Sequence, residues 1–269
     1  MKRARQRNGC TLKQVIAAIE RLAPPDRAEE WDNVGLLISP SRPTRVRRVM
    51  LTIDLTGAVA DEAVKRGVDL VVAYHPPIFE PLQRLSSETP AARRLLRILE
   101  SRIAVYSPHT ALDVADGGVN DWLVEGVCDS PESARIEPIE PGPGRLIVFR
   151  KRVPLATLCH RIKEYLKVDY LRAAAPPKGT KSVKRVALCA GAGAAALEAA
   201  DADVWWTGEM KHHDILAANE RGITVILSEH THTERGYLRV FKKRLARELG
   251  GDVELCISRA DRDPVRVFL

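Results

Sequence analysis

The chain has 269 residues, of which 45% are hydrophobic and 29% charged, and its net charge is +7. This length can bury one large or two moderate hydrophobic cores, and the composition is that of an ordinary globular protein. No apolar run approaches the roughly 20 residues of a membrane-spanning helix, and the first residues lack the apolar segment of a secretory signal.

The first half of the chain alternates between helices and buried strands. Residues 11–25 place apolar side chains at helical spacing and end at two prolines, which predicts a helix. Runs rich in β-branched residues then predict strands at 47–54, 68–75 and 102–109. Helices are expected between these strands, at 61–67 and 92–101.

The second half continues this alternation. A strand, a helix and a strand are expected at 144–151, 155–166 and 168–174, and four more strands at 183–190, 202–208, 223–229 and 252–258. Residues 129–144 are rich in proline and acidic residues, which predicts a linker. The pattern predicts an α/β protein with two mixed α/β lobes, residues 1–135 and residues 136–269.

Cysteine usage and charge limit the possible partners. The five cysteines lie far apart without a C-x-x-C pair, which favours a reducing compartment and argues against a cysteine-held zinc site. The positive charge suits an anionic ligand, but the basic residues are spread along the chain, so direct nucleic-acid binding is not expected. The basic opening MKRARQRNG is expected to be a solvated tail, with an organelle-targeting remnant as the alternative.

Histidines follow several of the predicted strands. Six of the seven do so, namely His75, His109, His212, His213, His230 and His232. Three acidic residues accompany them at or near strand ends, namely Asp54, Asp113 and Glu209. Because ligands collect at the carboxyl ends of strands in open α/β sheets, this concentration predicts a polar or metal-bearing cleft.

Two short motifs each have two interpretations. His230 and Glu234 are four residues apart, so on a helix they are either two metal ligands on one face or a solvated helix start with an acidic residue near its N-terminus. CAGAGAAAL, residues 189–197, is either a phosphate-binding loop or a tight strand-to-helix turn. It lacks G-K-[ST] and G-x-G-x-x-G, which favours the turn.

Several longer stretches together resemble one known family, the GTP cyclohydrolase I type 2 homologues, also called Ngg-one-interacting-factor-three-like proteins. They are EEWDNVGLLI, LTIDLT, DLVVAYHPPIF, VYSPHTALDVADGGVNDWL, CAGAGAAAL, DVWWTGEMKHHD and SEHTHTERG. They occur in the family's order between about residue 10 and the last residue. The sequences of these stretches are most similar to those of the eukaryotic-type members.

The resemblance implies a two-lobed α/β fold with a pair of divalent metal ions in the cleft between the lobes. The ligands that it implies are His75, Asp113, His230 and Glu234, with Asp113 bridging the ions. Many bacterial members have a second histidine where this chain has Tyr74, so one or two ions are expected. Alternatively, Tyr74 packs against its strand and donates a hydrogen bond to a nearby carboxylate. Imidazole and carboxylate ligands suit zinc, iron or manganese.

The resemblance also implies a function. A metal-dependent hydrolase of a nucleotide-like small molecule is expected, resembling GTP cyclohydrolase, with His109 and His213 as candidate general acid–base residues. The alternatives are a non-catalytic metal-binding ring and a partner-binding, transcription-related regulator. The resemblance implies a homo-oligomer, often a hexamer. The expected location is the cytoplasm, with mitochondrion and nucleus as alternatives.

Overall fold

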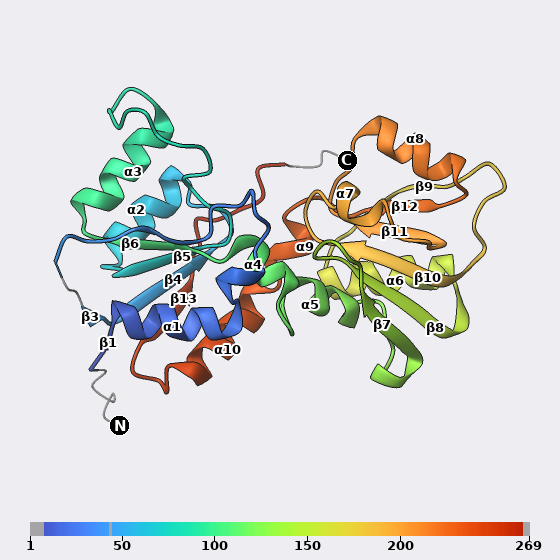
Figure 1. Ribbon diagram of the computed structural model, residues 1–269, viewed down its shortest axis with the longest axis horizontal. Coiled ribbons are helices and arrows are strands. Elements are labelled where there is room, and N and C mark those ends of the chain that lie inside the picture. Colours follow the sequence, from blue (N-terminus) through green and yellow to red (C-terminus); the bar gives the residue numbers. More distant parts are fainter. Residues whose placement is uncertain (1–7, 43–44, 266–269) are drawn as a thin grey trace. The chain divides into compact units, whose positions relative to one another are not determined.

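The structure is a computed structural model that describes residues 8–42 and 45–265 (Figure 1). The basic tail predicted at the N-terminus falls largely on residues 1–7, outside the described residues. The chain divides into two compact units. The first comprises residues 1–115 and 238–269, and the second comprises residues 116–237.

The first unit carries a five-stranded sheet with helices on both faces. Its strands lie in the order β13 (Glu254–Ile257), β4 (Arg48–Thr52), β5 (Leu70–Ala73), β6 (Ala104–Ser107) and β2 (Gly35–Ile38). The first four strands are parallel, and β2 runs antiparallel to β6. Figure 1 shows α2 (Gly57–Lys65) and α3 (Pro90–Glu100) on one face, and α1 (Leu12–Leu22) and α10 (Leu238–Glu248) on the other. The smaller elements are β1 (Cys10–Thr11), β3 (Arg45–Val46), the 3-10 helix η1 (Pro25–Arg27) and α4 (His109–Val114).

The helix predicted near the N-terminus is confirmed as α1. The Thr11 hydroxyl accepts a hydrogen bond from the Gln14 backbone amide, and the Gln14 side chain accepts one from the Thr11 amide. This capping box satisfies two backbone donors that the first helical turn would otherwise leave open. The apolar stripe at helical spacing is buried against the rest of the first unit, at Val15, Ala18, Ile19 and Leu22.

The second unit carries a six-stranded mixed sheet. Its strands lie in the order β7 (Ala134–Pro138), β8 (Arg145–Pro154), β10 (Ser182–Cys189), β11 (Val204–Thr207), β12 (Thr224–Leu227) and β9 (Arg172–Ala174). The three strands β10, β11 and β12 are parallel. Figure 1 shows α7 (Ala194–Leu197) and α8 (His212–Glu220) over one face, and α5 (Val119–Glu125) and α6 (Leu155–Leu166) over the other. The short elements are the 3-10 helix η2 (Pro131–Ser133) and α9 (His232–Arg235).

Two mixed sheets with helices on their faces confirm the predicted α/β class, but the chain is divided differently from the predicted lobes 1–135 and 136–269. Strand β13 pairs in parallel with β4, with Leu255 opposite Val49, so the end of the chain belongs to the first sheet. The predicted linker 129–144 also contains a strand, since β7 pairs antiparallel with β8. As an edge strand, β7 tolerates acidic and proline residues that an interior strand would exclude. Among the described residues, no helix is both long and apolar enough to cross a bilayer.

Glu62 on α2 fastens the segment after β13 to the first unit. Its carboxylate accepts hydrogen bonds from the Ser258 hydroxyl at 2.6 Å and from the backbone amides of Arg259 and Ala260 at 2.8 and 2.9 Å. Arg66 one turn later adds an ion pair at 2.9 Å. Burial opposes ionisation of Glu62, but these donors outweigh it and lower the pKa to about 2.

We expect Glu62→Gln to lower the free energy of unfolding by about 2 kcal/mol at neutral pH, because charge-assisted hydrogen bonds are lost. Since the folded-state pKa lies below the ordinary value of 4.5, the ionised group stabilises the protein above pH 4.5, and this is lost as the pH falls toward 2. The difference between wild type and variant, measured by urea denaturation, therefore narrows across that interval. Glu100→Gln, at an exposed position on α3, is the control and is expected to change little. Equal effects of the two variants would contradict the assignment.

Candidate metal centre

Three neighbouring parallel strands of the first unit end at the same edge of the sheet. Strand β4 leads to Asp54, β5 leads to Tyr74 and His75, and β6 leads to His109 at the start of α4. The registers of β4 with β5 and of β5 with β6 align these ends. The predicted gathering of histidine and carboxylate at strand ends is therefore present within this unit.

His75 is oriented by a carboxylate from the adjacent strand end. Its Nδ1 lies 2.9 Å from Asp54 Oδ1, and the ring is half-buried. Because an ionised carboxylate can only accept, Nδ1 is the donor in this contact, and in the neutral ring the lone pair is then on Nε2. This is the arrangement that orients metal-binding histidines in proteins.

His109 has the same kind of partner. Its Nδ1 lies 2.8 Å from Asp32 Oδ1, and the Asp32 side chain is fully buried. The amide and hydroxyl of Thr110 also donate to Asp32, at 3.0 and 2.5 Å. Burial disfavours the charged form of Asp32, but these donors outweigh it and lower the pKa of the carboxyl below its usual value. His109 is thus a fixed side chain at the edge of the candidate site.

Tyr74 and Asp113 contact each other directly. The buried Tyr74 hydroxyl donates a hydrogen bond to Asp113 Oδ1, and Asp113 is itself buried on α4. This hydrogen bond is the one expected if Tyr74 packs on its strand and donates to a nearby carboxylate, while its part in metal binding stays a prediction. The bridging role expected of Asp113 stays a prediction.

The second unit has a matching arrangement at the ends of β10, β11 and β12. These strands lead to Gly191, Glu209 and His230. His230 Nδ1 lies 2.9 Å from Glu209 Oε1, and its Nε2 lies 3.1 Å from Glu234 Oε1. Helix α9 begins at His232, two residues later than a helix starting at His230 would, yet the His230 and Glu234 side chains still meet. Glu234 is only 3% exposed.

Gly191, in the CAGAGAAAL stretch, supports the His230–Glu234 pair. The segment forms the tight turn between β10 and α7. The Gly191 carbonyl accepts hydrogen bonds from the amides of Gly208 and Glu209, both at 3.0 Å, and its amide donates to the Thr233 hydroxyl at 2.8 Å. The residue has φ +62°, and a Cβ there would lie 2.8 Å from Glu234 Oε1. Only glycine gives the backbone this conformation and this approach without strain.

A cavity of about 690 Å³ lies between α7 and α8 of the second unit. Glu209, which holds His230, also lines it, together with Lys211 and Asp214. His213, a candidate acid–base residue, is exposed near the start of α8, where its ring centroid lies 5.4 Å from that of His212. The acid–base role of His213 stays a prediction.

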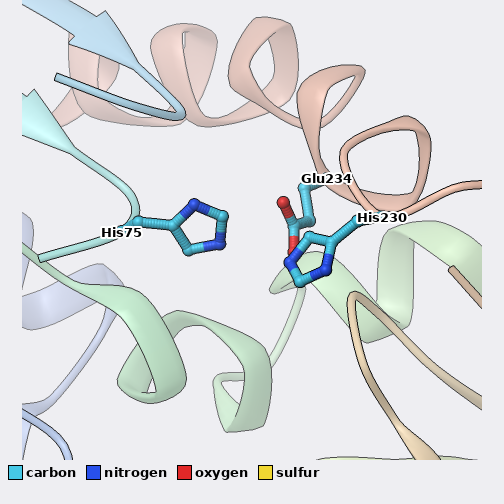
Figure 2. Close-up of side chains that lie close together, drawn as sticks. All are labelled: His75, His230 and Glu234. Carbon is cyan, nitrogen blue, oxygen red and sulfur yellow. The ribbon is translucent and has the colours of Figure 1, made fainter. Parts of the chain in front are cut away.

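Figure 2 shows His75 on the loop after β5, and His230 and Glu234 on the segment that contains α9. By donor type, these two imidazoles and one carboxylate form a group that could hold a metal ion. The sequence predicts His75, His230 and Glu234 as ligands. It indicates Asp54 and Glu209 only as neighbouring acids and assigns no role to Asp32, although each of these three carboxylates orients a histidine.

We expect Gly191→Ala to lower the free energy of unfolding by about 1–2 kcal/mol, from the left-handed backbone and the displaced Glu234 side chain. We also expect it to weaken zinc binding, because Glu234 and His230 must move. Gly222→Ala is the matched control: its φ is +82°, but a Cβ there meets nothing within 4 Å. Urea denaturation and zinc titration measure the two effects. Equal zinc affinities in the two variants would contradict the role of Gly191.

Comparison with known proteins agrees with this description. Residues 10–264 match the family described as Duf34/NIF3 (NGG1p interacting factor 3). NIF3-like protein 1 of Rattus norvegicus is 34% identical, over 95% of this chain and 92% of its own length. The NIF3 homolog of Schizosaccharomyces pombe is 39% identical, over 94% and 96% respectively. NGG1-interacting factor 3 of Saccharomyces cerevisiae is 38% identical, over 95% and 96%.

Solved structures share the fold. Reduced HcgD from Methanocaldococcus jannaschii superposes with a TM-score of 0.81 at 27% identity, covering 92% of this chain and 97% of its own. A Bacillus cereus protein related to NIF3 gives a TM-score of 0.80 at 20% identity, covering 96% and 99%, and so shows similarity of fold alone. From the family match along nearly its whole length, we conclude that the chain belongs to the Duf34/NIF3 family.

Proposed function

We propose that this protein binds a divalent metal ion through His75, His230 and Glu234 and hydrolyses a nucleotide-like small molecule there. The observation that carries the proposal is the fixed orientation of both imidazoles. In each, a carboxylate lies at Nδ1, and this arrangement orients Nε2 in metal-binding histidines. Glu234 Oε1, already 3.1 Å from His230 Nε2, supplies a charged oxygen donor.

Zinc, iron and manganese all fit two imidazoles and a carboxylate. Thiolates do not compete for this role, because the three-residue group contains no cysteine. We propose Asp113 as a further ligand, which would have to share its carboxylate with the Tyr74 hydroxyl. A phenol has a pKa near 10, so Tyr74 is a poorer ligand than the histidine of bacterial members, and one well-held ion is favoured over two.

A divalent ion would supply the acidity of a bound water, whose pKa falls from 15.7 toward about 7. The residues of the chain then have separate tasks. His109, with Nδ1 held by Asp32, keeps Nε2 for moving a proton to or from a substrate. His213 is a second candidate for proton transfer. The net charge of +7 favours an anionic substrate such as a nucleotide.

A second candidate function is partner binding as a regulator of transcription. The name of the Saccharomyces cerevisiae relative, NGG1-interacting factor 3, favours the partner-binding part of this candidate. A metal-binding assembly without turnover is a third candidate. In each case we propose a homo-oligomer, hexameric by resemblance, located in the cytoplasm, with mitochondrion and nucleus as alternatives.

The ligand assignment predicts metal content. Purified protein is expected to carry at least one divalent ion per chain, and His75→Ala, His230→Ala and Glu234→Ala are each expected to lose it, because each removes a ligand. Elemental analysis measures this directly. His160→Ala, at an exposed position on α6, is the control and is expected to keep its ion. Full occupancy in all three ligand variants would refute the assignment.

The hydrolase proposal predicts metal-dependent turnover. In a screen of nucleotides that includes GTP, we expect product with metal-loaded protein and none after chelation. His109→Ala is expected to lower kcat by about 10²–10⁴-fold while keeping its metal, because it removes proton transfer and no ligand. Chromatography of the products measures both. Metal-loaded protein that turns over no nucleotide would favour the non-catalytic candidates instead.

A further inference from the structure

Two aromatic side chains of the first unit are unusually exposed. Trp31 is 61% exposed and Phe79 is 50% exposed, and their ring centroids lie 6.0 Å apart. The other three tryptophans of the chain are at most 8% exposed, namely Trp122, Trp205 and Trp206. A single exposed apolar side chain needs no explanation, but a paired set of large rings is a feature of binding surfaces.

This pair adjoins the histidines of the same unit. Trp31 meets the His109 ring edge-on at 6.1 Å, and His109 lies 5.3 Å from His75 and 5.5 Å from Tyr74. A continuous set of ring contacts therefore leads from the exposed pair to a proposed metal ligand. Apolar rings with a polar imidazole at their edge suit a ligand that is itself flat and partly polar.

The loops that carry the two rings are held in place. The Asn33 side-chain amide donates to the carbonyl of Ile78 at 2.6 Å, which links the Trp31 loop to the Phe79 loop. On the other side of Trp31, the Glu29 amide donates to the Thr110 hydroxyl at 3.1 Å. Asp32, next in sequence to Trp31, is bound to His109 and Thr110. Ordering such a pair on binding therefore costs little entropy.

We propose that Trp31 and Phe79 bind the flat heteroaromatic ring of the substrate, with His109 hydrogen-bonding to its polar edge. The inference rests on the proposed function and names the ring-binding part of that site. The planes of Trp31 and Phe79 are inclined at 52°, so a planar ligand stacks on one ring and meets the other at an angle. Purines and pterins present both a π-face that stacks on aromatic side chains and a polar edge, whereas inorganic phosphate has no face that could stack on these rings.

Tryptophan fluorescence tests this directly, because Trp31 is the exposed tryptophan. Guanosine and GTP are titrated into the metal-loaded protein, with inorganic triphosphate as the probe that lacks a ring. We expect both ring-bearing probes to quench the emission and triphosphate not to do so. Trp31→Phe should abolish the quenching yet keep most of the affinity, measured by equilibrium dialysis, because phenylalanine also stacks. Trp31→Ala and Phe79→Ala should each weaken guanosine binding by about 10-fold or more.

The controls separate this inference from the metal proposal. Leu99→Ala, at an exposed position on α3, should leave guanosine binding unchanged. Elemental analysis of the Trp31 and Phe79 variants should show wild-type metal content. A loss of ring binding in these variants is therefore a separate result from a loss of metal in the His75, His230 and Glu234 variants. If wild type binds neither ring-bearing probe, or if Trp31→Ala binds both as tightly as wild type does, the inference is overturned. A Trp31→Ala variant that dissociates in light scattering with unchanged guanosine affinity would also overturn it, and would assign the pair to contact between copies of the chain.

Discussion

An imidazole can offer one nitrogen to a ligand in a fixed direction only if its other nitrogen is held, and the candidate centre depends on this constraint. Three carboxylates do the holding, at 2.8–2.9 Å from Nδ1 of His75, His109 and His230. For His75 and His230, histidine and acid leave neighbouring parallel strands. Strand pairing within each sheet therefore places the carboxylate next to Nδ1 of the histidine and so orients Nε2 of His75 and of His230.

The strands, the first helix and the position of the histidines can be predicted from the sequence, because each depends on the pattern of apolar residues in one short segment. Buried parallel strands are continuous apolar runs, so β4, β5 and β6 were evident, and the carboxyl ends of such strands meet at one edge. The position of the histidines directly after those runs is therefore enough to indicate a site. The helix at residues 12–22 was equally evident, because its apolar spacing and its end at a proline pair are local properties.

What could not be predicted depends on contacts between distant residues. The apolar run at 252–258 suits either sheet, and only pairing with β4 places it in the first. Asp32 and His109 are 77 residues apart, so nothing in the sequence joined them. The sequence leaves two possibilities for Tyr74, and only the fold shows that its hydroxyl reaches Asp113, which is 39 residues away. The exposure of Trp31 cannot be predicted from the sequence either, because tryptophan side chains are on average highly buried in globular proteins.

The return of the chain to its first sheet sets an order of events during synthesis. The second unit has all of its residues by position 237, whereas the first still lacks α10 and β13. Until β13 leaves the ribosome, β4 is an open edge, and its unpaired backbone groups can pair with the strands of other chains. The nascent protein therefore has its complete second unit before β13 can pair with β4 in the sheet of the first unit.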